Sequence, residues 1–242
     1  MKPVLFISDL HLDASRPEVT ALFLEFLASR ARDAAALYIL GDLFEAWIGD
    51  DDTDSHHARV QDNMRALVDG GVPGYFMHGN RDFLVSAQFA ARTKFVLLED
   101  PTVIDLFDRP TLLMHGDTLC TDDVNYQKVR RMFRNPEWQR EFLAQPLDAR
   151  RAFADSARAE SKAAQAGLAM DIMDVNREAV NAAFMAHDVT RLVHGHTHRP
   201  GVHTFLLQGK TRQRIVLGDW YEQGSVLSAT PAGLSLTTLP LS

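Results

Sequence analysis

Seven side chains that can bind metal ions follow short apolar runs along this chain. They are Asp9, His11, Asp42, Asn80, His115, His196 and His198. The preceding runs, such as residues 4–7 and 37–40, have the length and composition of β-strands. In an open α/β sheet, ligands bind outside the carboxyl ends of the strands. The order therefore predicts that five strands deliver oxygen and nitrogen ligands to one sheet edge, where they form the site of a two-metal hydrolase.

The elements that must position these side chains alternate in the first half of the chain. Apolar residues at 19, 22, 23, 26 and 27 have helical spacing, and a second helix is expected over residues 57–69, before Gly70 and Gly71. Residues 121–187 break this rhythm and are rich in helical patterns. Alternating runs at 203–207, 213–217, 225–229 and 234–239 predict antiparallel strands. We expect one α/β (α+β) domain over residues 1–242, a mixed β-sandwich flanked by helices, with a helical cap inserted at about 121–187.

Composition narrows the class of protein. A chain of 242 residues can bury a large core, and its net charge of −7 argues against a general nucleic-acid binder. Cys120 is the only cysteine, so an intrachain disulfide is excluded and a buried structural thiol is expected. No apolar stretch approaches the ~20 residues that span a bilayer, and the first apolar run is too short for a signal peptide. These features predict a cytoplasmic protein.

The individual motifs are weak, but their order is specific. Asp-x-His and Gly-Asp occur in many proteins, whereas Gly195-His196-Thr197-His198 is stronger, because residues two apart in a flat strand face the same side. The chain has neither a cysteine cluster nor the His-x-x-His spacing of helical zinc sites, which disfavours a structural zinc ion. A run of acidic and histidine residues at 50–57 is interpreted as a solvated loop in preference to a third metal site.

Five blocks together resemble those of the calcineurin-like metallophosphoesterases. The blocks are Asp9-Leu10-His11, Gly41-Asp42, Gly79-Asn80-Arg81-Asp82, His115-Gly116-Asp117 and Gly195-His196-Thr197-His198. The resemblance implies that Asp9, His11, Asp42 and His198 hold one metal, that Asp42, Asn80, His115 and His196 hold the second, and that Asp42 bridges the two. Mixed carboxylate, amide and imidazole ligands suit Mn²⁺ or Fe²⁺ better than Mg²⁺.

One position departs from that family and is informative. Many members have histidine after Gly-Asn, which assists the departure of an alkoxide, whereas this chain has Arg81. Arginine stays protonated and cannot act as a general acid, but it can neutralise phosphate charge through bidentate hydrogen bonds. A phosphate leaving group needs no proton donor. Arg81 therefore favours a pyrophosphate substrate.

Longer strings are similar to one family within this group, the UDP-2,3-diacylglucosamine pyrophosphatases of lipid A biosynthesis. These strings are residues 38–51, 78–83, 114–123, 172–176 and 194–200. The resemblance implies hydrolysis of UDP-2,3-diacylglucosamine to UMP and 2,3-diacylglucosamine 1-phosphate (lipid X), with water attacking the α-phosphorus. It further implies two metal ions, usually Mn²⁺, and a location on the cytoplasmic face of the inner membrane.

The same resemblance implies the residue roles. Catalysis would involve Asp42, Asn80, Arg81 and His196. Substrate contacts would come from Asn80, Arg81, Asp123, Tyr126, Arg158, Ser161 and His196. Two further positions depart from the family: Gln165 stands where asparagine is common and keeps an amide, whereas Leu168 stands where lysine can occur and cannot pair with a phosphate.

The cap segment has its own charge pattern. Residues 126–162 contain nine Lys or Arg and five Asp or Glu, a local net charge of +4, interleaved with Phe133, Trp138, Phe142, Leu143 and Phe153. An ordinary amphipathic hairpin with a solvated basic face is one interpretation. The other is an acyl-binding cap in peripheral contact with an anionic membrane. Two rival functions are a different nucleotide phosphodiesterase, which needs no such cap, and an inactive scaffold, which would usually have lost ligands.

Overall fold

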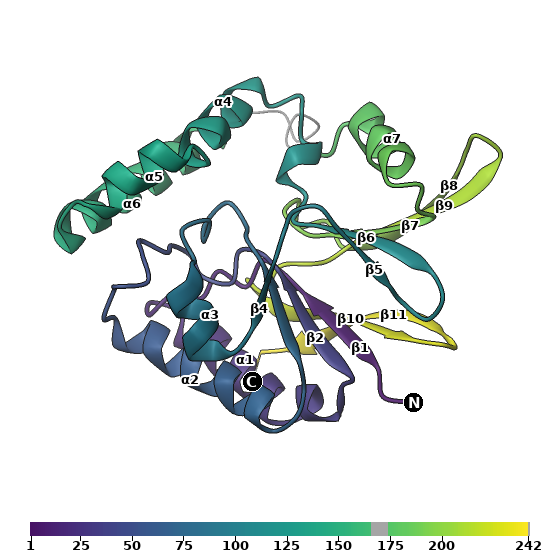
Figure 1. Cartoon of the computed structure of the whole chain (residues 1–242), viewed down its shortest axis with the longest axis horizontal. Coiled ribbons are helices and arrows are strands. Elements are labelled where there is room, and N and C mark those ends of the chain that lie inside the picture. The colour runs from purple at the N-terminus through teal and green to yellow at the C-terminus, as the bar shows by residue number, and fades with distance from the viewer. Residues whose placement is uncertain (166–173, 242) are drawn as a thin grey trace.

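Two mixed β-sheets form the centre of the computed structural model, which describes residues 1–165 and 174–241 (Figure 1). The first sheet has the order β11-β10-β1-β2-β3-β4. Its strands are β1 (Val4–Ile7), β2 (Ala36–Leu40), β3 (Gly74–Met77), β4 (Val96–Leu98), β10 (Gln223–Thr230) and β11 (Gly233–Pro240). Strands β1 to β4 are parallel to one another, and β10 is antiparallel to both β1 and β11.

The second sheet has the order β5-β6-β7-β9-β8. Its strands are β5 (Thr102–Asp105), β6 (Pro110–Met114), β7 (Arg191–His194), β8 (Gly201–Leu207) and β9 (Lys210–Val216). Strands β6, β7 and β9 are parallel, while β5 and β8 pair antiparallel at the two edges. The expected mixed β-sandwich is therefore confirmed, and the C-terminal strands do form antiparallel hairpins, β8–β9 and β10–β11.

Burial on both faces explains why β1 is apolar throughout. Leu5 and Ile7 belong to the core that faces α1 (Pro17–Ala28) and α2 (Ser55–Asp69), whereas Phe6 faces the second sheet. Residues of both sheets fill the layer between them: Phe6, Leu40, Met77, Leu113, Val193, Ile215 and Leu227 are all fully buried. Such a strand has apolar residues at successive positions because neither face meets water.

The remaining helices cover the outer faces. Figure 1 shows α1, α2 and α3 (Ala87–Thr93) grouped beside the first sheet. Helix α2 begins at Ser55, two residues before the predicted start, because the carboxylate of Asp54 caps it by accepting the N–H groups of His56 and His57. Helix α7 (Arg177–Ala186) packs Val180 and Phe184 against the second sheet. It therefore supports the core, although it falls in the segment expected to form the cap.

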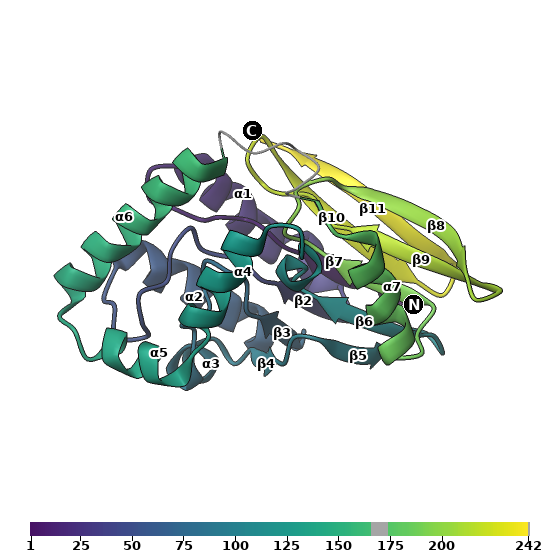
Figure 2. The same cartoon turned by 90° about the horizontal axis from the view of Figure 1, so that it is seen from above.

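Three further helices project to one end of the molecule, as Figures 1 and 2 show: α4 (Val124–Phe133), α5 (Pro136–Leu143) and α6 (Leu147–Gln165). We call these three helices the cap. Buried Arg150 anchors α6 by donating to the backbone carbonyl of Ile48 at 2.6 Å and to the Asp51 carboxylate at 2.8 Å. Within the described part of the chain, no helix is both long and apolar enough to cross a membrane.

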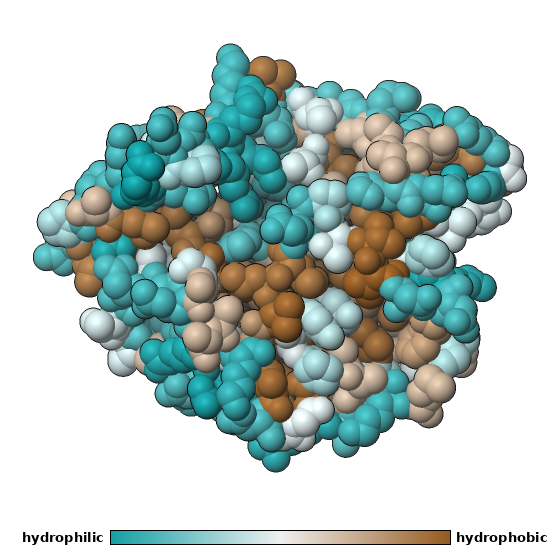
Figure 3. All heavy atoms as spheres, viewed as in Figure 1, coloured by the Kyte–Doolittle hydropathy of each residue, from teal (hydrophilic) through white to brown (hydrophobic). Residues whose placement is uncertain are grey.

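Aromatic rings line the inner side of the cap. Phe133 stacks on Phe83 with ring centroids 5.5 Å apart, and Trp138 lies within 6 Å of Phe133, Phe142 and Phe153. These five rings are the aromatic cluster of the cap. In Figure 3 the exposed surface over the cap helices is mostly hydrophilic, while hydrophobic residues gather along the edge that faces the rest of the molecule.

Candidate metal centre

The seven predicted ligands converge from two sheets. Asp9 and His11 follow β1, Asp42 follows β2 and Asn80 follows β3, all in the first sheet; His115 follows β6, and His196 and His198 follow β7, in the second. The prediction that one sheet edge supplies them is therefore wrong. The carboxyl ends of parallel strands from two facing sheets meet, which encloses the site on both sides and buries most of its side chains.

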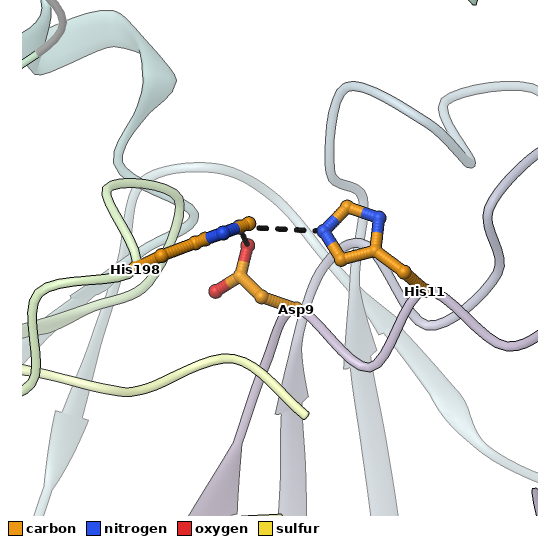
Figure 4. Close-up of side chains that lie close together, drawn as sticks. All are labelled: Asp9, His11 and His198. Atoms are coloured by element: carbon orange, nitrogen blue, oxygen red, sulfur yellow. Dashed lines mark hydrogen bonds and ion pairs between the residues drawn. The ribbon is translucent and has the colours of Figure 1, made fainter. Parts of the chain in front are cut away.

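Asp9, His11 and His198 form the first group. Their ligand atoms lie within 4.8 Å of one another. Nε2 of His11 is 3.3 Å from Nε2 of His198, which in turn is 3.5 Å from an oxygen of the fully buried Asp9. In Figure 4 the two imidazoles point toward one another across the carboxylate, from separate loops.

The second group consists of Asp42, His115 and His196, again with ligand atoms within 4.8 Å of one another. Asn80 completes it, because its Oδ1 lies 3.0 Å from Nε2 of His115 and 2.9 Å from Nδ1 of His196. The other ring nitrogen of His115 faces the backbone carbonyl of Leu40 at 2.9 Å. That contact holds the imidazole so that Nε2 is directed at the group.

Asp42 lies between the two groups. One of its oxygens is 3.8 Å from Nε2 of His11, in the first group, and the other is 3.9 Å from Nε2 of His115, in the second. The backbone N–H of Arg81 donates to Asp42 Oδ1 at 2.8 Å. The carboxylate therefore presents one oxygen to each group, which is the arrangement that a bridging ligand requires.

The backbone around the site is unusual. Asp9, His11, Asp42, His196 and His198 all have positive φ, between 49° and 68°. Such conformations are uncommon in residues other than glycine and cluster at functional sites. His196 and His198 lie in the loop after β7 and not in a flat strand, and left-handed turns aim them at the two different groups of the site.

Two glycines permit this close approach. A Cβ on Gly79 would lie 2.1 Å from Oδ1 of Asp42, and one on Gly41, which has φ of +88°, would lie 2.6 Å from Nδ1 of His115. Any side chain at either position would displace a ligand. Glycine therefore precedes Asp42 and Asn80 for two reasons: no side chain fits beside the ligands, and glycine allows the turn.

The electrostatics of the site favour a cation. Burial alone would lower the pKa of His115. The nearby carboxylates of Asp42, Asp117 and Asp9 outweigh burial and raise that pKa to about 9. Burial and neighbouring His115 lower the pKa of His196 to about 4. Despite its burial, contacts with His198 and His115 hold the pKa of Asp9 well below its usual range. Anionic Asp9 and neutral His196 already have the protonation states that metal binding requires, whereas His115 must lose a proton when a metal ion binds.

Unsatisfied polar atoms support the same conclusion. Among the described residues, Asp9 Oδ1 is buried without a hydrogen-bond donor. The nitrogens of His11 and His198 that face each other need a proton or a cation between them. Buried polar atoms normally have partners, so these atoms fit divalent metal ions coordinated by both groups.

Several supporting residues escaped the sequence analysis. Fully buried Asp82 accepts the backbone N–H groups of Gly79 at 2.8 Å and Leu43 at 2.7 Å, and so fixes the loops carrying Asn80 and Asp42. Burial and the nearby Asp42 carboxylate raise the pKa of Asp82 to about 6. Its position at the end of the Gly79-Asn80-Arg81-Asp82 block could have predicted that it supports the neighbouring ligand Asn80.

Two acidic residues outside the five ligand blocks contact ligand histidines. Glu45 lies 3.1 Å from Nδ1 of His11, and Asp219 lies 3.4 Å from Nδ1 of His198. Such carboxylates orient an imidazole and raise its basicity toward a metal. Nothing in the sequence around Asp219 pointed to this contact, because it follows β9, far from the β7 loop in the chain.

The predicted substrate-contact residues lie in separate places around the site. Arg81 and Arg158 line a cleft beside the first group. The ring of Tyr126 lies 5.7 Å from that of His196, and its hydroxyl donates to the fully buried Asp117 at 2.9 Å.

Asp123 caps α4 by accepting the N–H of Tyr126. Ser161 and Gln165 belong to α6 by their backbone, and Leu168 lies outside the described residues.

Other predictions concern residues around the centre. Cys120 is buried, and burial raises the pKa of its thiol to about 12, in agreement with a structural role. Trp47 and Trp220 are buried in the core. Asp54, His56 and His57 come close enough together to hold an ion, but the Asp54 carboxylate accepts backbone N–H groups as the cap of α2. The run is nevertheless not the solvated loop that was expected, because residues 55–57 begin α2 and the Asp50 carboxylate accepts the N–H groups of Ser86 and Phe89.

Comparison with known proteins gives matches over the whole chain. The model of the calcineurin-like phosphoesterase family matches residues 2–200. The UDP-2,3-diacylglucosamine hydrolase of Xanthomonas campestris pv. campestris is 53% identical over 98% of this chain and 99% of the relative. That of Stenotrophomonas maltophilia is 52% identical over 97% of this chain and 98% of the relative. An archaeal phosphodiesterase structure covers 98% of this chain and 99% of its own, with a TM-score of 0.52 at 10% identity, which is a likeness of fold.

Proposed function

This chain belongs to the calcineurin-like phosphoesterase family, and we propose that it hydrolyses the pyrophosphate bond of UDP-2,3-diacylglucosamine, giving UMP and 2,3-diacylglucosamine 1-phosphate. The observation that carries the proposal is the pair of ligand groups joined by Asp42, in a chain that is more than half identical to relatives named for this hydrolysis. The reaction belongs to lipid A biosynthesis.

The proposed metal ligands are the two groups described above. Asp9, His11 and His198 would hold one divalent ion, Asn80, His115 and His196 the other, and Asp42 both. The mixed set of carboxylate, amide and imidazole donors favours Mn²⁺ or Fe²⁺ over Mg²⁺, and we propose Mn²⁺, the ion that the family resemblance implies. When bound, the two ions supply Lewis acidity that activates water and neutralises charge on the phosphoryl oxygens.

The chain's own residues would position the substrate. Arg81 lies beside Asp42 through its backbone and faces the cleft with its side chain. Its buried Nε has no hydrogen-bond partner among the described residues, so a phosphate oxygen is a suitable acceptor. Because Arg81 stays charged, it stabilises the leaving lipid phosphate by neutralisation and does not donate a proton. This fits cleavage at the α-phosphorus of a pyrophosphate.

Product analysis is the experiment that tests the proposal. Protein loaded with Mn²⁺ is incubated with UDP-2,3-diacylglucosamine in water enriched in ¹⁸O, and the products are separated and weighed by mass spectrometry. We expect UMP and the lipid monophosphate in equal amounts, with the label in UMP, because water attacks the α-phosphorus.

Cyclic AMP serves as the comparison substrate in the same assay. Faster turnover of cyclic AMP than of the lipid nucleotide would support the rival phosphodiesterase function and contradict the proposal. Purified protein without stoichiometric metal, and without any turnover, would instead support an inactive scaffold. The retained ligand geometry argues against that second outcome.

The aromatic cluster of the cap is the proposed acyl site. Phe83, Phe133, Trp138, Phe142 and Phe153 offer apolar surface close to the loop that carries Asn80 and Arg81. Two fatty acyl chains require such surface. The outer side of α4 also has exposed apolar residues, including Val124, Val129 and Met132, next to exposed Lys128 and Arg131. We propose that this side of α4 contacts the anionic cytoplasmic face of the inner membrane.

Vesicle binding tests the membrane contact. Near an anionic surface each base is worth about 1 kcal/mol, so replacing Lys128 and Arg131 by alanine is expected to weaken binding to phosphatidylglycerol vesicles by about 30-fold. Co-sedimentation measures this change. Alanine at exposed Arg59 and Lys210, which lie outside the cap, is the matched control. Equal binding by both double variants would contradict the proposed contact.

A further inference from the structure

A polar cleft of about 600 Å³ opens beside the first ligand group. Its walls come from the loops after β1, β2 and β3, the turn before β10 and one side of α6. Three arginines and two carboxylates line it, with Tyr221 as the aromatic residue. The volume is typical of small-molecule sites, which span about 300–1,000 Å³. This lining contrasts with the aromatic cluster of the cap, so the two regions suit chemically different parts of one ligand.

The cleft adjoins the metal ligands directly. Its residue Glu45 is 3.1 Å from Nδ1 of His11, and Tyr221 stacks on the His11 ring with centroids 5.2 Å apart and planes 11° from parallel. A ligand whose phosphate lies at the two groups can therefore extend into the cleft without passing the cap's aromatic cluster.

Arg16 and Tyr221 form one wall. The guanidinium of Arg16 lies 4.6 Å from the centre of the Tyr221 ring. Nη2 of Arg16 donates to the backbone carbonyl of His11 at 2.7 Å and, more weakly, to that of Leu10 at 3.4 Å, which fixes the side chain. Among the described residues, no contact of Arg16 uses Nη1 or Nε, so these N–H groups can meet a ligand.

Asp13, in the same turn as Arg16, and Arg158 of α6 also line the cleft. A nitrogen of Arg158 lies 3.9 Å from an oxygen of Asp13. Carboxylates accept hydrogen bonds from sugar hydroxyls, while arginines donate to phosphate and to the carbonyl oxygens of a base. A flat guanidinium and a tyrosine also offer surfaces for an aromatic base. Acyl chains find no such apolar surface here.

We propose that this cleft is the subsite for the nucleoside of the substrate, with Arg16 and Tyr221 contacting the pyrimidine base and Asp13 the ribose side. The inference rests on the proposed function and divides the substrate between two regions: the nucleoside beside the first ligand group and the acyl chains at the aromatic cluster. The scissile phosphate then lies at the ligands between them. Arg16 and Tyr221 are specificity-determining residues in this arrangement.

Calorimetry with two probes tests the subsite without any turnover. UMP and ribose 5-phosphate differ only in the base, and both are titrated into the Mn²⁺-loaded protein. We expect UMP to bind at least ~5-fold more tightly, since stacking of one base is worth about 1–3 kcal/mol. In Arg16→Ala and in Tyr221→Ala this preference should fall to within twofold, while the affinity for ribose 5-phosphate stays within twofold of the wild type.

Arg59→Ala, on the exposed side of α2, is the matched control and should keep the full preference. Equal binding of both probes to the wild-type protein would overturn the subsite, as would an unchanged preference in both variants. If the wild-type protein releases no UMP from the lipid nucleotide but the preference is present and is lost in the variants, the substrate assignment fails and the subsite stands. If the protein releases UMP from the lipid nucleotide but both variants keep the preference for UMP, the substrate assignment stands and the proposed subsite is wrong.

Discussion

Replacing Asp42 with alanine is expected to lower kcat for the lipid nucleotide by at least ~10³-fold. Asp42 has one oxygen near each ligand group, at 3.8 Å from His11 and 3.9 Å from His115. Metal ions contribute several kcal/mol of transition-state stabilisation, and each 1.36 kcal/mol is tenfold in rate, so loss of the shared ligand removes about three orders of magnitude. Steady-state kinetics measure the loss.

Metal content distinguishes this role from a general structural one. Plasma emission spectrometry on the Asp42→Ala protein should find less than the two ions per chain expected of the wild type. Asp62→Asn, an exposed carboxylate on α2 that pairs with Arg92, is the control and should keep full activity. A variant with two bound ions and near wild-type kcat would contradict the bridging role of Asp42.

Arg81→Ala is expected to lower kcat/KM for the lipid nucleotide by about 10²–10³-fold, the usual cost of removing one donor that stabilises transition-state charge. The side chain faces the cleft, and its buried Nε has no other hydrogen-bond partner among the described residues. Arg81→Lys keeps the charge without the planar fork and should recover part of the loss. Steady-state kinetics measure kcat/KM for the wild type, Arg81→Ala and Arg81→Lys, with Arg92→Ala as a control.

A second replacement tests how Arg81 acts. Arg81→His introduces a group that can donate a proton, which a phosphate leaving group does not require. We expect this variant to stay close to Arg81→Ala with the pyrophosphate substrate between pH 7 and 9, where the imidazole is largely neutral at its ordinary pKa of about 6.5. Activity of Arg81→His equal to the wild type would contradict charge neutralisation and would indicate proton transfer at this position.

Much of the candidate site could be predicted from the order of residues. Strands β1, β2, β3, β6 and β7 are short, apolar and buried on both faces, so their positions are encoded locally. Polar residues that directly follow such strands must lie at their carboxyl ends, which accounts for all seven convergent ligands. The sequence alone also showed that this chain has Arg81 where many members of the family have histidine.

Other features were not encoded locally. Apolar burial is non-directional, so a buried strand does not specify which sheet it joins. The division of the ligands between two sheets, with β1, β2 and β3 in one and β6 and β7 in the other, therefore required the fold. For the same reason α7 resembled a cap helix in the sequence, yet it packs Phe184 against the second sheet.

The sequence by itself determined which side chains can hold metal ions and at which strand ends they lie, because strand periodicity and residue chemistry are local properties. Only the tertiary structure decided how those side chains are aimed. The left-handed backbone at His196 and His198 separates two neighbouring histidines into different groups. Glu45 and Asp219 reach ligand histidines, and Arg16 meets Tyr221, across loops that the chain keeps far apart. These contacts depend on how distant strands pair, which no short stretch of sequence specifies.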